Sequence, residues 1–334
     1  MLGDITWTML AQSATGPAGL VAVRLNPQSR FNIFAALDQA TGHRFLLLKS
    51  GRSNLRPATA LPVGRGFSVT FVSTPADPDG AHSLRFELTD PSHADVFDVI
   101  GNDVLRHLLP AADEAKAFAV FVSRISEWQQ FLDDLPREGL SEQAQQGLFA
   151  ELWFLQKFLL AEIGPRRAVG SWAGPKALAK DFHFEGLSFE IKASSAKQHT
   201  RFHINSEVQL DPAGVHRLIL TGLLLERMVA GGTSLTDLVS ALRADLLASD
   251  PASAFQFSEL LLQAGYVDAD AARYSARFAV RSEQFFDVKD DFPRIVGADL
   301  RLGVGDVRYT ILLSECGRHA LAEAEVRTLI RATA

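Results

Sequence analysis

One short stretch, DFHFEGLSFEIKAS at residues 181–194, constrains the fold of this chain more than any other. Apolar and polar residues alternate on both sides of a Glu-Gly pair, and this pattern predicts two antiparallel strands joined by a two-residue turn. Gly186 would supply the positive φ that such a turn requires. Because successive side chains of a strand point to opposite faces, the phenylalanines of both arms would share one face and the charged residues the other.

The turn also determines which residues face each other across the hairpin. With Glu185 and Gly186 in the turn, Asp181 would lie directly opposite Glu190, with the Cβ atoms about 4.5–5.5 Å apart. Two carboxylates at that distance repel each other, and a divalent cation would remove the repulsion, since Mg²⁺ binds one or two carboxylates together with water and phosphate oxygens. Lys192 would point toward the same place, where its ammonium could orient or deprotonate a water molecule and offset charge on phosphorus. The arrangement suits phosphodiester hydrolysis.

The hairpin alone leaves two alternatives open: its charges form a site, or they are the solvated face of an ordinary surface hairpin. A helix upstream helps to distinguish them. The segment LSEQAQQGLFAELWFLQKFLLAEIG, residues 140–164, has the strongest helical pattern in the chain. Ser141 is the expected N-cap, and Gly164 with Pro165 is expected to end the helix. Glu151 lies beside the leucine stripe of this helix, where an acid is unusual unless it is paired or binds a cation. Glu151 is therefore a third candidate acid.

The remaining patterns predict an α+β chain with two folded parts. Short apolar segments divided by Gly, Pro, Asn and Asp predict a meander of about five strands over residues 19–90. Two helices separated by Pro110 follow, and the second half reads as helix, hairpin, strands, helices and strand, which predicts a mixed sheet flanked by helices. We expect a β-rich N-terminal domain at 1–110, a helical connector at 111–138 and a catalytic domain at 139–334.

Composition limits the classes of function that this chain can serve. The net charge of −6 argues against coating nucleic acid by bulk charge, although a local basic groove remains compatible with it. The single cysteine, Cys316, excludes an internal disulfide framework and a cysteine-cluster zinc site. The sequence begins without a signal-peptide pattern and has no apolar stretch of about 20 residues, so we expect a cytoplasmic protein that does not bind membranes.

The order of these residues resembles a known superfamily. Glu on a core helix, Asp on a strand and Glu-x-Lys on the adjacent strand is the order found in PD-(D/E)XK nucleases. The segments GLFAELWFL, SWAGPKALAKDFHF, FEIKASS and FHINSEVQL are similar to a family of PD-(D/E)XK motif proteins of otherwise unknown function, which often sit beside bacterial restriction and phage-defence genes. Two departures are visible: Lys180 replaces the proline of the motif, and the spacing between its two acids is short.

The resemblance implies a restriction-endonuclease-like fold for the second part of the chain and a role for each motif residue. Asp181, Glu190 and Glu151 would bind Mg²⁺, or Mn²⁺ in its place, and Lys192 would be the catalytic lysine. Gln209 would match a further polar position found in some members. Beside these residues, His203 on a neighbouring strand and the small Ser194 after the lysine are candidates for accessory contacts with phosphate or with the metal site.

The function expected on this basis is Mg²⁺-dependent cleavage of DNA in a restriction or phage-defence system, with other defence proteins as partners. One such site cuts one strand, so cleavage of both strands would require a homodimer or two successive cuts. The alternative is a catalytically silent nuclease-like subunit that binds DNA or a partner protein. The acidic net charge favours this alternative, whereas an intact set of three acids and a lysine favours the enzyme.

Overall fold

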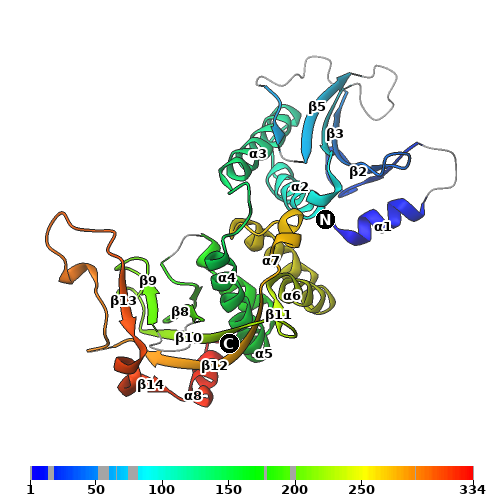
Figure 1. Ribbon diagram of the computed structural model, residues 1–334. Coiled ribbons are helices and arrows are strands. Elements are labelled where there is room, and N and C mark those ends of the chain that lie inside the picture. Colours follow the sequence, from blue (N-terminus) through cyan, green and yellow to red (C-terminus); the bar gives the residue numbers. More distant parts are fainter. Residues whose placement is uncertain are drawn as a thin grey trace. The chain divides into compact units, whose positions relative to one another are not determined.

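A computed structural model describes residues 2–13, 19–51, 60–64, 66–73, 82–176, 179–195, 201–289 and 291–333. The chain forms two compact units, Met1–Arg137 with Val267–Ala269, and Glu138–Tyr266 with Asp270–Ala334. Figure 1 shows the first unit in blue and cyan and most of the second in green to red. The long helix α3 (Glu114–Asp134), which the sequence analysis assigned to a connector, lies within the first unit.

The first unit contains an antiparallel sheet with the strand order β1-β2-β3-β6-β5-β4. The predicted simple meander is wrong in one respect, because β6 lies between β3 and β5 instead of at an edge. Burial is the physical reason for the central position of β6. This strand is buried along most of its length, whereas the edge strand β1 is largely exposed. The described elements of this unit are α1 (Asp4–Gln12), β1 (Leu20–Arg24), β2 (Asn32–Asp38), β3 (Arg44–Ser50), β4 (Val63–Gly64), β5 (Phe67–Ser73), β6 (His82–Leu88), η1 (Pro91–His93), α2 (Ala94–Leu108) and α3.

Two helices of the first unit pack on one face of this sheet through aromatic side chains. Phe97 of α2 stacks on Phe86 of β6 with ring centroids 4.5 Å apart, and Trp7 of α1 lies 6.0 Å from the same Phe97 ring. All three rings are buried. As predicted, α2 and α3 are separate helices with Pro110 between them.

The second unit is built around a mixed sheet with the order β11-β12-β10-β8-β7, and β14 pairs with β12. Strands β8 and β10 are parallel, and the other described pairs are antiparallel. The predicted α+β architecture, a β-rich first part followed by a mixed sheet flanked by helices, is confirmed. Its described elements are α4 (Glu142–Phe154), the π-helical η2 (Leu155–Leu160), α5 (Ala161–Ser171), η3 (Gly174–Lys176), β7 (Phe182–His183), β8 (Leu187–Ser194), β9 (Arg201–Ile204), β10 (Arg217–Met228), β11 (Thr233–Ser234), α6 (Leu235–Ser249), α7 (Pro251–Gln263), β12 (Arg277–Asp287), η5 (Gly297–Asp299), β13 (Tyr309–Leu312), η6 (Leu313–His319), β14 (Ala320–Leu321) and α8 (Glu323–Arg331); the turn η4 (Asp268–Arg273) begins in the first unit and ends in the second.

The helix predicted from residue 140 begins as expected, and Gly164 interrupts it. The Ser141 Oγ accepts a hydrogen bond from the Ala144 N–H at 3.2 Å, and Glu142 is the first helical residue. Gly164 has φ 73°, which breaks the helix, and α5 continues after Pro165. Before this break, the helix has a continuous apolar side from α4 through η2.

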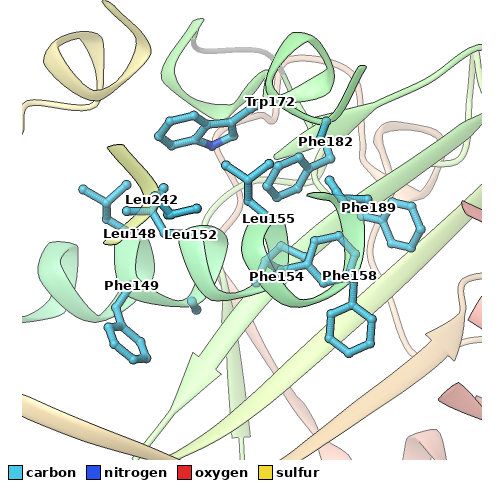
Figure 2. Close-up of a cluster of buried hydrophobic side chains, with 14 of the residues drawn as sticks. Leu148, Phe149, Leu152, Phe154, Leu155, Phe158, Trp172, Phe182, Phe189 and Leu242 are labelled. Atoms are coloured by element: carbon cyan, nitrogen blue, oxygen red, sulfur yellow. The ribbon is translucent and has the colours of Figure 1, made fainter. Parts of the chain in front are cut away.

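This apolar side packs against the hairpin and forms the larger core of the second unit. The Phe154 ring lies 5.4 Å from Phe182 and 5.0 Å from Phe189, one in each arm of the hairpin. Figure 2 shows these rings together with Leu155 and Trp172 beside the helix. All five side chains are fully buried, so the core holds the hairpin firmly against the helix that carries Glu151.

The opposite face of the mixed sheet has a core of its own. Strand β9 pairs with β13, and Phe202 of β9 packs so closely over Gly222 of β10 that a Cβ at that glycine would lie 2.3 Å from its ring. Gly222 is the parallel-strand neighbour of Lys192, and Leu220 is that of Glu190. The charged side of β8 therefore lies under the β9–β13 pair. Among the described residues, no helix is long and apolar enough to span a membrane.

Candidate active site

The hairpin adopts the register that its sequence predicts. Phe182 pairs with Phe189 and His183 with Ser188, and Gly186 has φ 83° in the turn. Phe182 and Phe189 are buried, whereas His183 is exposed. The alternation of faces that placed the acids and Lys192 together is therefore confirmed.

Asp181 differs in detail from the prediction, because it lies just outside the ladder and does not pair directly with Glu190. Its N–H donates to the Phe189 carbonyl at 3.1 Å, and its carbonyl accepts the N–H groups of Ala173 and Gly174 at 2.8 and 3.1 Å. The Asp181 Oδ2 then accepts the Ile191 N–H at 2.6 Å. The loop just before the hairpin thus binds the Asp181 carbonyl, and the carboxylate lies against the β8 backbone at Ile191.

Glu190 and Lys192 form a buried ion pair on β8. The Glu190 side chain is 1% exposed, and its Oε1 lies 2.6 Å from the Lys192 Nζ. The other carboxylate oxygen, Oε2, has no hydrogen-bond partner among the residues that the structure describes. The Lys192 Nζ also donates to the Gln209 Oε1 at 3.1 Å, and this oxygen accepts the Asn205 N–H at 2.8 Å. Gln209 therefore holds the ammonium in place.

Glu151 and Asp181 converge on Gly174. The Glu151 Oε2 accepts a hydrogen bond from the Trp172 Nε1 at 2.8 Å. A Cβ placed on Gly174 would lie 3.0 Å from this same oxygen and 3.2 Å from the Asp181 Oδ1. Glycine at this position leaves space between the two carboxylates that no other residue would leave.

All three carboxyl groups have raised pKa values. Burial is the main cause, and it raises the pKa of Glu190 to about 8 with a further contribution from the charge of Asp181, which Lys192 partly offsets. Burial and then Asp181 raise the pKa of Glu151 well above its ordinary value. Burial also raises the pKa of Asp181, although Lys192 and the Ile191 N–H act against it. The site carries more acid than its own cations can neutralise.

The two lysines of the site differ in their electrostatics. Burial by itself would lower the pKa of Lys192, but the neighbouring Glu190 and Asp181 outweigh it and raise that pKa above its ordinary value. Burial lowers the pKa of Lys180, despite the acids nearby, and the Lys180 Nζ donates to the Val208 carbonyl. The neighbouring acids therefore favour the charged form of Lys192.

These groups lie at a cleft of about 810 Å³. Glu151, Asp181 and Lys192 line it, and the nearly inaccessible Glu190 lies behind Lys192. Of the predicted accessory residues, His203 and Gln209 line the cleft, whereas Ser194 is buried and is not among the described lining residues. Other lining residues that the sequence analysis did not single out as site residues are Gln143, Gln146, Gly174, Asn205, Gln263 and Arg308.

The residues missed from sequence belong to segments that only the fold brings to the hairpin. Trp172 and Pro175 belong to the segment SWAGPKALAKDFHF, which resembles the family. Trp172 is fully buried and donates to Glu151, and Pro175 lines the cleft. Gly174 and Asn205 lie in two of the segments that resemble the family, but no spacing pattern connects either residue to the acids.

The donor set fits a hard divalent cation. Its three acids supply oxygen ligands of the kind that Mg²⁺ and Mn²⁺ prefer, and the Glu190 Oε2 is a buried oxygen without a hydrogen-bond partner among the described residues. Within the described ranges, no three His, Cys, Asp or Glu side chains are already arranged as a metal centre, since Glu190 is turned to Lys192 while Glu151 and Asp181 flank Gly174. Binding a cation with all three acids would require Glu190 to turn away from the ammonium.

Glu151→Gln is expected to stabilise the protein at pH 8 and to have no such effect near pH 4.5. A carboxyl group whose folded-state pKa is raised loses stability as pH rises above its unfolded value of 4.5, whereas glutamine does not ionise and still accepts the Trp172 N–H. We expect a gain of about 0.5–2 kcal/mol at pH 8, measured by urea unfolding in EDTA at both pH values.

Glu162→Gln is the matched control for this experiment. The side-chain hydrogen bond from Arg327 and the nearby Arg331 lower the pKa of Glu162, so its removal should destabilise the protein at pH 8. A destabilised Glu151→Gln protein at pH 8, or a gain that does not change with pH, would show that Glu151 is an ordinary structural acid.

Comparison with known families gives a match over most of the chain. A family profile described as "Putative PD-(D/E)XK family member, (DUF4420)" matches residues 4–314. The matched span includes the helix with Glu151, the hairpin with Asp181, Glu190 and Lys192, and most of the first unit. No curated protein and no solved structure matches the chain significantly.

Proposed function

The chain belongs to this PD-(D/E)XK family, and on that premise we propose that it hydrolyses DNA phosphodiester bonds with a divalent cation bound by Glu151, Asp181 and Glu190. The observation that carries the proposal is the concentration of three carboxyl groups with raised pKa values beside a lysine at one cleft. Buried acids of this kind lower stability, and a cation-dependent reaction is a physical reason for a fold to retain them.

Each residue has a distinct role in this proposal. Mg²⁺ would supply Lewis-acid activation of the phosphoryl group and of water. Asp181 and Glu151 would bind the ion from the two sides of Gly174, and Glu190 would complete the ligand set. Lys192, which lines the cleft, would offset the negative charge that builds on the phosphate oxygens. Before a cation binds, the charges of Glu190 and Asp181 raise the pKa of Lys192 and favour its ammonium form.

A cleavage assay with the full chain tests the proposal directly. Plasmid, linear duplex, single-stranded DNA and RNA would each be incubated with Mg²⁺, with Mn²⁺ or with EDTA. We expect cleavage of DNA with either cation and none with EDTA. DNA binding without cleavage of any substrate would overturn the proposed enzymatic function and support the catalytically silent nuclease-like subunit.

We also propose that this activity serves restriction or phage defence together with other defence proteins. Support for this setting is the resemblance to a family that occurs beside such genes. Efficiency of phage plating on cells that express the wild-type chain, compared with cells that express the Lys192→Met chain, would test it. If phage plate with equal efficiency on both strains, although the purified protein cleaves DNA, the activity does not serve phage defence.

Gly174→Ala is expected to lower cation affinity by about 10-fold, a loss typical of a disturbed ligand environment. The added Cβ would lie 3.0 Å from the Glu151 Oε2 and 3.2 Å from the Asp181 Oδ1, where it forces the ligands apart. Mn²⁺ titration followed by electron paramagnetic resonance measures the affinity. The control is Gly170→Ala, since a Cβ on Gly170 meets nothing within 4 Å. Equal affinities in the two variants would mean that the cation does not bind between Glu151 and Asp181.

A further inference from the structure

The loop that leads into β13, residues 300–308, has an apolar tip; we call it the rim loop. Leu302 is fully exposed, at 107%, and Val304 is 54% exposed. Figure 1 shows the orange segment before β13 as an arm that projects from the sheet of the second unit. Two exposed aliphatic side chains on one short loop contribute nothing to either core of this unit, and such groups often mark a contact with a partner.

The base of the rim loop is anchored to the body of the second unit. The Glu207 Oε2 accepts the Val307 N–H at 3.0 Å, and the Val304 N–H donates to the Arg301 carbonyl at 3.0 Å. Gly303 has φ 85° and Asp306 has φ 55°, so the backbone turns sharply at both positions. These hydrogen bonds and turns fix the backbone from which the apolar tip projects.

This base lies beside the candidate active site. Arg308, at the end of the rim loop, lines the cleft. Glu207, the anchor, lies between Asn205 and Gln209, which line the cleft as well, and Gln209 holds the Lys192 ammonium. Whatever occupies the cleft will pass close to the rim loop.

The rim loop carries two arginines and one acid, Asp306, so its net charge is positive and fits a polyanion with apolar surfaces. Arg301 and Arg308 are exposed, and neither has an ion-pair partner in the part of the chain that the structure describes. In nucleic acids, phosphates accept hydrogen bonds from guanidinium groups, while exposed base faces accept apolar side chains. An aliphatic tip between two free guanidinium groups complements that combination.

We propose that the rim loop is a nucleic-acid wedge: Leu302 and Val304 contact or separate bases next to the bond that is cut, while Arg301 and Arg308 contact flanking phosphates. This inference rests on the proposed function and deepens it. Inserting side chains between bases costs stacking energy, so the wedge favours DNA whose bases are already unstacked. The preferred substrates would be mismatched, kinked or single-stranded DNA.

Leu302→Ser tests the wedge, with Leu247→Ser as the control. Leu247 is an exposed leucine at 46%, located near the junction of α6 with α7, whereas the cleft is lined by the opposite end of α7 at Gln263. The α7 helix of 13 residues separates the two places by about 20 Å. Binding would be measured with Ca²⁺, using duplex DNA that carries 2-aminopurine, a base whose fluorescence rises on unstacking, with and without a central mismatch.

We expect Leu302→Ser to weaken binding of mismatched DNA by about 3- to 10-fold and to abolish the rise in 2-aminopurine fluorescence, while Leu247→Ser changes neither. Wild-type affinity and fluorescence in Leu302→Ser, with cleavage by the wild type intact, would overturn the wedge alone and favour a protein partner for the rim loop. A wild-type chain that neither binds nor cleaves any nucleic acid would overturn the proposed function, and the wedge with it.

Discussion

Lys192→Met is expected to abolish phosphodiester cleavage while cation binding is retained. The Lys192 side chain is 13% exposed, and Glu190 and Gln209 hold its ammonium, so methionine removes the charge with little change in volume. Loss of one preorganised charge of this kind costs about 10²–10⁴-fold in rate. The lysine also competes with a cation for the Glu190 carboxylate, which means that its removal should leave the affinity for Mn²⁺ unchanged or higher. Single-turnover cleavage and Mn²⁺ titration measure the two effects separately.

The matched control is Lys157→Met. Lys157 forms an ion pair with Glu283 at 2.6 Å and is not among the described lining residues of the cleft. We expect this variant to cleave DNA at the wild-type rate. Cleavage by Lys192→Met at a similar rate would show that Lys192 takes no part in the reaction. Loss of cation binding in Lys192→Met would show that its role is to shape the ligand set.

Asp181→Asn is expected to weaken Mn²⁺ binding by at least about 10- to 100-fold and to stop cleavage. Asp181 is the central acid of the site, because its charge raises the pKa of both Glu151 and Glu190. Asparagine can still accept the Ile191 N–H, and it removes like-charge repulsion, so the fold should be at least as stable as the wild type. Because the Asp181 charge contributes to the raised pKa of Glu190, the titration is done at several pH values for both proteins.

Glu185→Gln serves as the control for this prediction. Glu185 is an exposed carboxylate in the turn of the same hairpin and is absent from the described lining of the cleft. Its loss should change neither Mn²⁺ affinity nor cleavage. If Asp181→Asn bound Mn²⁺ as tightly as Glu185→Gln, Asp181 would not be a ligand.

Local sequence predicted the parts of this site that depend on local chemistry. Alternation and a glycine turn were sufficient for the pairing of Phe182 with Phe189, and an N-cap serine marked the start of α4. The order of the acids together with the flanking segments indicated the family, which the match over residues 4–314 confirms.

Non-local contacts account for what the sequence did not reveal. The Ala173–Gly174 backbone bonds to the Asp181 carbonyl and displaces Asp181 from its expected place opposite Glu190. Gln209 reaches Lys192 from a segment with no regular pattern of its own. In the first unit, β6 pairs with both β3 and β5, a strand order that local propensity does not encode. The predicted boundaries at 110 and 138, the metal, the DNA substrate and the cytoplasmic location stay predictions.

The most direct test of the central claim is anomalous diffraction from crystals of the full chain soaked in Mn²⁺. We expect a manganese peak beside Gly174, about 2.0–2.4 Å from carboxylate oxygens of Asp181 and of Glu151 or Glu190. We expect no peak there in Asp181→Asn crystals soaked in the same way. A wild-type crystal without manganese at this place, at a concentration that supports cleavage in solution, would contradict the account.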